Sequence, residues 1–537
     1  MISDQLRSEV RDWIISDPDK KTAAQLQNWL DENNEIELKR CFNGFLQFGT
    51  AGLRGPIGPG PSCMNRAVVS RTATGIAAFM NSHDLTSVVI GRDARHGSAE
   101  FALDSAEIFA GAGIKTFVLP RELPTPVLAF AVKKLSASLG IMVTASHNPA
   151  SDNGYKVYLG GEIGGVKYQG SQIIDPIDQE ISKQILKADL SPERSSSFEI
   201  VSEEVVNDYI LNVTKLVNVP NSLKIIYTAL HGVGTQTVLK VFEKAKFAPL
   251  ILVAEQSQPN PDFPTTPFPN PEENGAMDLA MDYAKKYNAD LIIANDPDAD
   301  RCAIGINEPN SGWRILRGDE VGVILGKYLI DSGRLTGKTM SNSLVSSTLL
   351  SKIAFKYKIN FEETLTGFKW ISKVPNLGYG YEEALGYCVD PDSVNDKDGI
   401  STAVLIAQLA GELKAKSSSL LDYLQSIGEE FGFHATDQIS IRVKELVEID
   451  NFLIKIKSNP PKQIAGQDLE SIGDLGISKK LKTPGIRMIF KGGTRVIIRP
   501  SGTEPKLKCY IEVVCNTKDE AAELLSQIKA ALTKVLS

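Results

Sequence analysis

The sequence predicts a multidomain α/β protein, and three observations support that prediction. Its 537 residues exceed what one hydrophobic core supports, so several domains are expected. Short apolar strands alternate with amphipathic helices in two separate stretches, which is typical of doubly wound sheets. After about His434 the pattern changes to a group of strands followed by one helix, which predicts an α+β domain.

The two alternating stretches begin at Ser87 and after about Asn221. The first predicts strands at 87–93, 116–120 and 138–146, with helices at 98–113 and 124–137. The second predicts strands at 223–230, 249–255 and 290–296, with helices at 235–246 and 274–288. Each stretch therefore reads as a βαβαβ series.

The remaining chain divides into a helix-rich segment and a strand-rich tail. From Trp313 the helical pattern covers 314–333, 346–358 and 400–416, with short strands between them. The tail predicts strands at 439–443, 485–490, 494–500 and 506–514, and then a helix at 519–536.

Composition excludes several classes of protein. With 58 basic and 65 acidic residues the net charge is -7, which argues against a nucleic-acid surface. The six cysteines are scattered and form no CxxC pair, so neither a disulfide framework nor a zinc site is expected. The first 40 residues lack the apolar core of a signal peptide, and no apolar run is long enough to span a membrane. We therefore expect a cytoplasmic protein with no membrane partner.

The stretch TASHNPASDNGYKVY, residues 144–158, places a serine where ligands bind in α/β sheets. The apolar run 139–143 reads as a buried strand, so Ser146 follows its carboxyl end. A serine hydroxyl is a poor nucleophile and needs a base, a metal or a covalent group to become reactive. The stretch alone does not say which of these applies.

The stretch NDPDADR, residues 295–301, follows another apolar strand and predicts a metal site. Asp296, Asp298 and Asp300 alternate, so in an extended conformation their carboxylates point the same way. Three such charges repel unless a cation lies between them, and hard oxygen ligands suit Mg²⁺. A calcium loop fails because Arg301 and Asn307 stand where glycine and glutamate are needed. An acidic surface turn remains the alternative.

Two further loops could bind anions. In TRVIIRPSGTEPKLK a strand ends near Arg499, and the following turn offers backbone amides, hydroxyls and Lys506, which together resemble a phosphate cradle. In FGTAGLRGPIG the glycines allow close approach of a ligand, and Arg54 could pair with an anion. A hairpin turn with solvated cations and a plain structural loop are the respective alternatives.

These four stretches, together with YEEALGY and NDKDG, occur in the order and approximate spacing of the α-D-phosphohexomutase superfamily. The resemblance spans nearly the whole chain. It is greatest to the branch that holds bacterial phosphoglucomutases and the phosphoglucomutase/phosphopentomutase enzymes. It implies four domains around a central cleft, with three doubly wound α/β units followed by a smaller α+β C-terminal domain. The implied boundaries are 1–205 with the phosphoserine loop, 206–309 with the metal, 310–433 for sugar recognition and 434–537 for phosphate binding.

The resemblance also implies a reaction, in which a phosphoryl group moves between O1 and O6 of glucose phosphate. Ser146 matches the serine that carries the phosphoryl group and passes it to the sugar, giving a bisphosphate that turns and returns its other phosphate. Mg²⁺ would be the metal, and glucose 1,6-bisphosphate or an equivalent sugar bisphosphate the activator. The partners are small-molecule sugar phosphates, and the chain is a monomer or a homodimer.

The family motifs assign residues to three roles. The catalytic residues are Ser146, Lys156, His147 and Arg54, and the metal ligands are Ser146, Asp296, Asp298 and Asp300. The substrate-binding residues are Thr50, Arg54, Arg301, Thr366, Gly367, Lys369, Glu382, Lys397, Arg499, Ser501, Gly502, Thr503 and Lys506. Lys156 matches the general acid or base, and we expect burial among cations to lower its pKa. His147 is the competitor for that role.

The sequence departs from the family pattern at one sugar-binding position. Muscle-type enzymes read GEESFG where this chain reads YEEALG, so Ala384 replaces a serine. Discrimination between hexose and pentose phosphates is therefore open, and phosphomannomutase or phosphopentomutase activity is the alternative. Two readings from other classes are an aspartyl-phosphate phosphatase with Asp296 as nucleophile and a non-catalytic sugar-phosphate-binding regulator.

Overall fold

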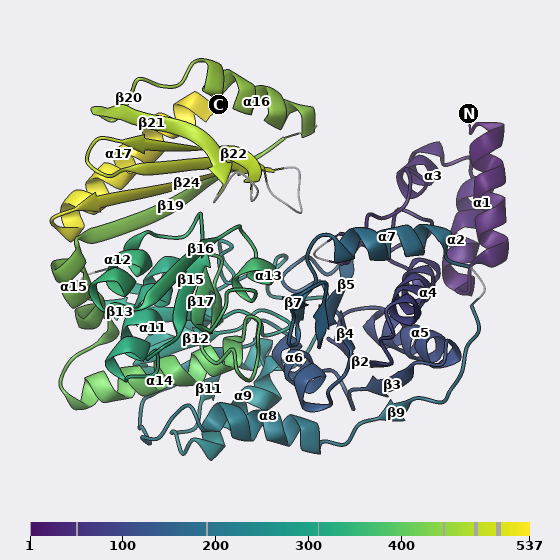
Figure 1. Ribbon diagram of the computed structural model, residues 1–537, viewed down its shortest axis with the longest axis horizontal. Helices are drawn as coiled ribbons and strands as arrows, with labels where there is room; N and C mark the ends of the chain where they lie inside the picture. Colours follow the sequence, from purple (N-terminus) through teal and green to yellow (C-terminus); the bar gives the residue numbers. More distant parts are fainter. Residues whose placement is uncertain are drawn as a thin grey trace. The chain divides into compact units, whose positions relative to one another are not determined.

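The computed structural model describes residues 2–49, 52–189, 192–309, 311–443, 446–476, 482–500 and 506–536 (Figure 1). The chain forms two compact units. The first contains Met1–Ile315 and Gly386–Gly411, and the second contains Leu316–Leu385 and Glu412–Ser537. None of the helices in the described residues is long and apolar enough to cross a membrane.

The first unit begins with three helices that the sequence analysis did not predict. They are α1 (Asp4–Ser16), α2 (Lys20–Asp31) and α3 (Glu35–Cys41). The side chains of Ser3, Asp19 and Asn34 cap their first turns by accepting backbone N–H bonds. The helices share a small core of their own, built around Val10 and Leu26. This core makes the segment a distinct part of the unit.

The first α/β sheet carries the predicted βαβαβ series. Its strand order is β1-β5-β4-β2-β3-β9, and β8 pairs with β5. The strands are β1 (Leu53–Pro56), β2 (Ser87–Arg92), β3 (Lys115–Val118), β4 (Leu139–Val143), β5 (Asp152–Leu159), β8 (Ser171–Gln172) and β9 (Glu199–Ile200). The helices are α4 (Arg66–Ser82), α5 (Ser98–Gly111), α6 (Thr125–Lys134) and α7 (Ile177–Lys187), and β6 (Glu162–Ile163) and β7 (Val166–Lys167) form a hairpin. Strand β2 is parallel to β3 and β4, so the predicted series is confirmed.

The second sheet has the order β11-β10-β12-β13-β14. Its strands are β10 (Ile225–Thr228), β11 (Ile251–Leu252), β12 (Leu291–Ala294), β13 (Ala303–Glu308) and β14 (Gly312–Ile315). The associated helices are α8 (Glu204–Thr214), α9 (Gly234–Lys244), η1 (Ala254–Gln256) and α10 (Asp278–Tyr287). Strand β10 is parallel to β11 and β12, as predicted for the second series. The unit also includes β18 (Gly386–Cys388) and most of α14 (Gly399–Ala415), which it shares with the second unit from Glu412 on.

The second unit holds a parallel group of strands and the strand-rich tail. Strand β15 (Thr339–Ser343) lies between β16 (Asn360–Thr364) and β17 (Leu377–Glu382) and is parallel to both. The helices are α11 (Gly318–Asp331), α12 (Leu349–Lys356), α13 (Phe368–Ile371) and α15 (Leu420–Phe431). This alternation confirms an α/β unit in the region that the sequence analysis read as helix-rich.

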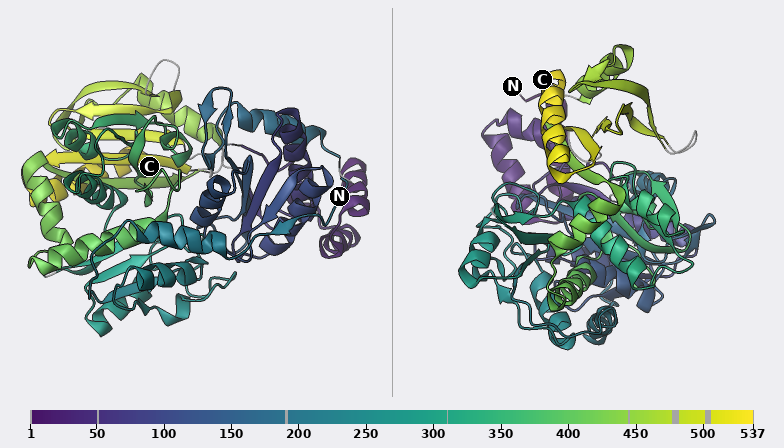
Figure 2. Two further views of the ribbon diagram at one scale, coloured as in Figure 1. Left: turned by 60° about the horizontal axis from the view of Figure 1, so that its bottom comes forward. Right: turned by 90° about the vertical axis from the view of Figure 1, so that its left-hand side faces the viewer.

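The C-terminal sheet is antiparallel and has the order β19-β24-β23-β22-β21-β20. Its strands are β19 (Phe433–Arg442), β20 (Gln463–Ile464), β21 (Gln467–Gly476), β22 (Lys482–Phe490), β23 (Arg495–Pro500) and β24 (Lys506–Cys515). Helix α17 (Lys518–Leu536) runs along one face (Figure 2), and α16 (Leu446–Ser458) packs near β22. The apolar side chains between helices and strands form one core, which confirms the predicted α+β domain.

Candidate active site

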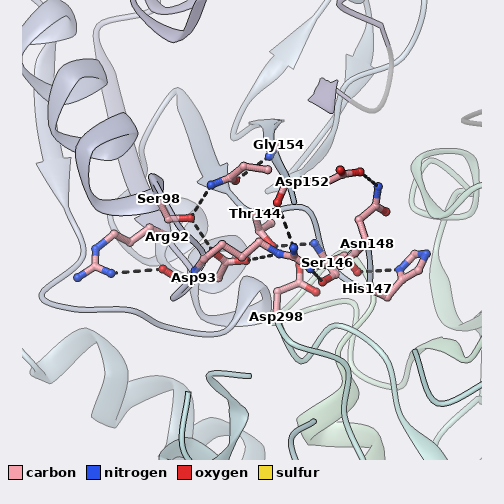
Figure 3. Close-up of polar contacts among 12 residues, drawn as sticks. Arg92, Asp93, Ser98, Thr144, Ser146, His147, Asn148, Asp152, Gly154 and Asp298 are labelled. Carbon is pink, nitrogen blue, oxygen red and sulfur yellow. Dashed lines mark hydrogen bonds and ion pairs between the residues drawn. The ribbon is translucent and has the colours of Figure 1, made fainter. Parts of the chain in front are cut away.

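Ser146 lies in a tight loop directly after β4 (Figure 3). Its backbone is left-handed, with φ 52°, and its N–H donates to Thr144 Oγ1 at 2.9 Å. The side chain is buried, and its Oγ donates to Asp296 Oδ2 at 2.6 Å. The same Oγ lies 3.1 Å from His147 Nδ1. The structure therefore brings the predicted serine, the histidine and one predicted metal ligand together.

His147 is a half-buried base beside Ser146. Burial lowers the pKa of its imidazole well below the usual range, and the nearby Arg301 and Arg54 lower it further. The imidazole is therefore neutral near pH 7, with one ring nitrogen able to accept a proton. Its Nδ1 is adjacent to the Ser146 hydroxyl, so it can exchange a proton with that oxygen.

Asp296, Asp298 and Asp300 follow β12, as the sequence predicts, but not in an extended conformation. The segment forms a turn in which Ala299 has a φ of 55° and donates its N–H to Asp296 O. The prediction that an extended strand brings the three carboxylates together is therefore wrong. The turn gathers the carboxylates, one oxygen from each lying within 4.8 Å of the others. All three are buried.

The hydrogen bonding of these carboxylates fits a bound cation. Asp298 Oδ2 accepts from Thr125 Oγ1 at 2.6 Å and from Lys156 Nζ at 2.7 Å, and Asp300 Oδ2 accepts from Lys156 Nζ at 2.8 Å. The Oδ1 atoms of Asp298 and Asp300 are buried and have no hydrogen-bond partner within the described part of the chain. Buried carboxylate oxygens without partners are unfavourable, and a hard divalent cation would satisfy them. The geometry and chemistry of the cluster therefore suit a bound metal ion.

The pKa values of the cluster reflect crowding of charge. Burial raises the pKa of Asp296 well above its usual range, and the neighbouring Asp298 and Asp300 raise it further. Burial also acts to raise the pKa of Asp300, but Lys156, Lys397 and Arg301 outweigh it and hold that pKa below its usual range. Asp298 and Asp300 therefore keep their negative charge although the cluster is buried.

Lys156 differs from expectation in its protonation. Burial acts to lower its pKa, but Asp298 and Asp300 outweigh burial and raise the pKa above its usual range. The expected lowering is therefore wrong, because the nearest groups are carboxylates rather than cations. Lys397 lies beside the same site, with its Nζ 3.5 Å from Asp300 Oδ2. Both lysines act here as positive charges.

Two arginines border the site. Arg54 on β1 donates from NH1 to Asn148 Oδ1 at 3.2 Å, and burial lowers the pKa of its guanidinium. Arg301 donates its backbone N–H to Asp296 Oδ1 at 3.0 Å. Gly52 has a φ of 76°, and a Cβ there would lie 1.7 Å from Tyr155 O, so only glycine allows β1 to approach β5. Thr50 lies outside the described residues.

The other predicted residues lie in the second unit. Thr366 and Gly367 lie in the loop that leads into α13, with φ 110° at Gly367, and Lys369 lies within α13. The buried Glu382 ends β17. Arg499 is on β23, and Lys506 begins β24. The residues on either side of the Thr366–Gly367 loop pack against the C-terminal sheet in one hydrophobic cluster. This cluster includes Leu365, Trp370, Ile497 and Tyr510. Ser501, Gly502 and Thr503 lie outside the described residues.

Two residues of the site were missed by the sequence analysis. Thr125 starts α6 and contacts Asp298 twice, through its hydroxyl at 2.6 Å and its backbone N–H at 2.9 Å. Arg95 follows β2 and donates to the backbone of the Ser146 loop. Both lie just after strands or at helix starts on the predicted ligand-binding edge of the sheet, which is the signal that could have found them.

Comparison with protein families identifies four consecutive domains. Models described as phosphoglucomutase/phosphomannomutase alpha/beta/alpha domains I, II and III match residues 46–191, 207–309 and 317–427. The model of the C-terminal domain matches residues 453–531. Together they cover most of the chain.

Several curated proteins are similar over nearly their full length. A probable phosphomannomutase of Haemophilus influenzae is 44% identical over 88% of this chain and 98% of its own. A human phosphopentomutase is 35% identical, over 99% and 95% respectively. A phosphoglucomutase of Staphylococcus aureus is 31% identical, over 96% and 97%. The crystal structure of a putative phosphomannomutase from Thermus thermophilus shares the fold, with a TM-score of 0.73 and 21% identity over 91% of this chain and 99% of that one.

Proposed function

The chain belongs to the phosphoglucomutase/phosphomannomutase family, and from that premise we propose that it moves a phosphoryl group between O1 and O6 of glucose phosphate. One observation carries the proposal. The Ser146 hydroxyl is hydrogen-bonded to Asp296 of the metal cluster and adjacent to a neutral His147. A hydroxyl with a base on one side and a metal ligand on the other is equipped for phosphoryl transfer.

In the proposed reaction, phosphorylated Ser146 gives its phosphoryl group to the free hydroxyl of a sugar monophosphate. The O–P bond to Ser146 breaks as a bond to the sugar oxygen forms. The proton that the sugar hydroxyl loses is transferred so that Ser146 Oγ becomes a hydroxyl again. The resulting bisphosphate reorients and returns its other phosphoryl group to Ser146. Phosphate is therefore conserved, and a sugar bisphosphate such as glucose 1,6-bisphosphate would phosphorylate any enzyme that has lost the group.

We assign proton exchange at Ser146 Oγ to His147. Its imidazole is neutral and within 3.1 Å of that oxygen. Lys156 is protonated and paired with two carboxylates, so it is better suited to offset charge than to accept a proton. This choice separates two roles that the sequence left open between these residues.

The three aspartates and Ser146 would hold Mg²⁺. The ion would offset the negative charge that develops on the transferring phosphoryl oxygens. Arg54 and Arg301 border the same loop and add fixed positive charge for the incoming phosphate. Lys156 holds Asp298 and Asp300 in place, and Lys397 holds Asp300. Both lysines also add positive charge to the site.

The second unit would recognise the rest of the substrate. We assign Arg499, Ser501, Gly502, Thr503 and Lys506 to the phosphate that does not react. We assign Glu382, Thr366, Gly367 and Lys369 to the sugar hydroxyls, together with Lys397 of the first unit. The domain boundaries expected from the sequence, 1–205, 206–309, 310–433 and 434–537, remain our proposal, and the matched family domains lie within them.

Mannose and pentose phosphates are the alternative substrates, because the similar proteins carry all three names. An aspartyl-phosphate phosphatase is less well supported. Both carboxylate oxygens of Asp296 are engaged, one with the Ser146 hydroxyl and one with the Arg301 backbone N–H. The similar proteins named above are all mutases rather than phosphatases.

The test is to assay the 1-phosphates of glucose, mannose and ribose with Mg²⁺ and the matching bisphosphates, and to locate phosphate on the protein by mass spectrometry. We expect interconversion with at least glucose 1-phosphate and one phosphate on Ser146. Absence of both interconversion and a phosphorylated serine would reject the proposal.

A further inference from the structure

The backbone of Ser146 adopts a conformation that serine does not prefer. Its φ of 52° lies in the left-handed region, where side chains other than glycine are uncommon. Such a conformation persists only when surrounding contacts impose it, and it occurs often at functional sites. The contacts that impose it here identify the residues that aim the Ser146 hydroxyl.

Arg95 makes several of these contacts with the loop. Its guanidinium donates to the backbone carbonyl oxygens of Ser146 at 2.6 Å, Asn148 at 2.6 Å, Pro149 at 2.7 Å and Asp152 at 3.1 Å. The side chain is almost completely buried. One cation thus holds both ends of the loop that begins at Ser146 and enters β5 at Asp152.

Arg95 is itself fixed by neighbours on two domains. Asp93 Oδ1 accepts the Arg95 backbone N–H at 3.0 Å and the Ser98 hydroxyl at 2.7 Å, while its Oδ2 lies 3.4 Å from Arg95 Nε. Figure 3 shows Asp93 and Ser98 beside the Ser146 loop. On the other side, the ring of Phe263, from the metal-binding domain, lies 4.9 Å from the guanidinium. The guanidinium therefore has little freedom to move.

We propose that Arg95 is a positioning residue that holds Ser146 in its left-handed conformation and so aims Oγ at the metal cluster. The inference rests on the proposed function, because it assumes that Ser146 receives the phosphoryl group. The chemistry of the contact requires arginine. A guanidinium presents five N–H donors in a fixed fork, whereas a lysine ammonium has three donors at one point and cannot span these carbonyls.

The consequence is specific to the transfer step. A displacement of about 1 Å at the reacting group can reduce the rate on the order of 10²-fold. Binding of the sugar phosphate relies on other residues, so its KM should change little. A residue that merely stabilises the fold would instead reduce the amount of folded protein and leave the rate per folded molecule intact.

The experiment compares Arg95→Lys with Arg92→Lys. Arg92 lies three residues away, and its side chain donates to Glu122 and to the Asp93 carbonyl. Within the described part of the chain this side chain makes no hydrogen bond to the Ser146 loop. The readouts are hydrogen exchange of the 144–155 segment, the rate of Ser146 phosphorylation by glucose 1,6-bisphosphate per folded molecule, and the sugar-phosphate KM. For Arg95→Lys we expect faster exchange confined to this segment, phosphorylation slower on the order of 10²-fold, and KM within about threefold of wild type. Arg92→Lys should match wild type in hydrogen exchange, in the rate of phosphorylation and in KM.

A second variant covers the case in which Arg95→Lys does not fold. Phe263→Leu retains the arginine and every charge but removes the ring, and we expect it to increase exchange in the same segment and to slow phosphorylation several-fold. The proposal is overturned if Arg95→Lys phosphorylates at the wild-type rate per folded molecule, if Arg92→Lys loses as much, or if Phe263→Leu leaves both readouts unchanged. Failure of the proposed function looks different, because wild type itself would then take up no phosphate at Ser146 while hydrogen exchange still reports on the loop.

Discussion

Both units bury carboxylates, a cluster of three aspartates in the first and Glu512 in the second, and their hydrogen bonding differs. In the first unit, Asp298 and Asp300 each bury one oxygen with no hydrogen-bond partner among the described residues. In the second unit, Glu512 is equally buried, but Oε1 accepts from Ser347 Oγ at 2.6 Å and Thr348 N at 2.8 Å, and Oε2 lies 2.9 Å from an Arg495 nitrogen.

The pKa shifts follow this difference. Burial and repulsion between neighbouring carboxylates raise the pKa of Asp296 well above its usual range. For Glu512 burial acts to raise the pKa, but Arg495, His434 and Ser347 outweigh it and lower the pKa to about 2. A fully bonded buried charge supports the fold, whereas an incompletely bonded one is stable only with an additional ligand. We therefore assign a chemical role to the aspartate cluster and a structural role to Glu512.

The largest effect should come from Ser146→Ala. We expect turnover to fall on the order of 10⁴-fold or more, because no other group takes the phosphoryl group. The thermal unfolding midpoint should stay near that of wild type, since the lost hydroxyl packs little. Ser151→Ala is the matched control, because this exposed serine lies in the same loop and its hydroxyl donates to Asp152 rather than to the cluster. Turnover close to wild type in Ser146→Ala would refute the assignment of chemistry to this cluster.

Asp298→Asn should reduce activity by about 10² to 10³-fold and weaken metal binding, because it removes one of three charges that hold the cation. Titration of activity with Mg²⁺ after chelation measures both effects. The exposed Asp282 on α10 provides the control Asp282→Asn. If Asp298→Asn and chelator both leave activity unaltered, the partnerless oxygens do not mark a metal site.

Much of the first cluster could be predicted because its residues sit at the ends of apolar strands. Ser146 follows β4 and Asp296 follows β12, and periodicity alone locates both strands. The resemblance to the family then supplied the expected roles of Ser146 and Asp296. The α/β repeats and the α+β tail were predictable for the same reason, since each element is long or strongly patterned.

The contacts between distant residues could not be predicted. Lys156 bonds to Asp298 and Asp300 across separations of 142 and 144 residues, and only the folded chain shows that carboxylates surround it. The turn at Ala299 and the left-handed Ser146 depend on tertiary contacts rather than local propensity. Helices α1–α3 were missed as a structured part because their stability comes from a small shared core.

Glu512→Gln tests the structural half of the comparison. The pKa falls from the usual 4.5 to about 2 on folding, so the charge contributes about 3 kcal/mol to the free energy of unfolding above pH 5. Because the folded pKa is depressed, this contribution is complete only above about pH 5 and is lost as the pH falls through 4.5 towards 2. Urea unfolding at several pH values should show the gap between wild type and variant narrowing over that range. The control is Glu520→Gln at an exposed position, which should leave the free energy of unfolding close to that of wild type.

The smallest effect concerns recognition of the sugar. Ala384 follows β17 in a turn that is held by Glu383, whose Oε2 accepts from Ser343 Oγ at 3.0 Å and Ser346 Oγ at 3.3 Å. Leu385 completes the turn with a φ of 62°. A serine at 384 can therefore be introduced without moving the turn. It would offer the sugar a hydroxyl that the methyl group lacks.

One regained hydrogen bond contributes about 0.5 to 1.5 kcal/mol, which corresponds to a change of only two- to about tenfold. We expect wild type to process ribose 1-phosphate measurably alongside glucose 1-phosphate, and Ala384→Ser to shift the ratio of their kcat/KM values towards glucose by that factor. Both sugars are measured with glucose 1,6-bisphosphate present, so that the phosphorylation of Ser146 is equal in every assay and the difference arises in the second unit alone. If wild type has no pentose activity and the variant keeps the wild-type ratio, position 384 does not determine specificity. The loop at 365–370 then becomes the better candidate, because its flanking side chains pack against the strand that carries Arg499.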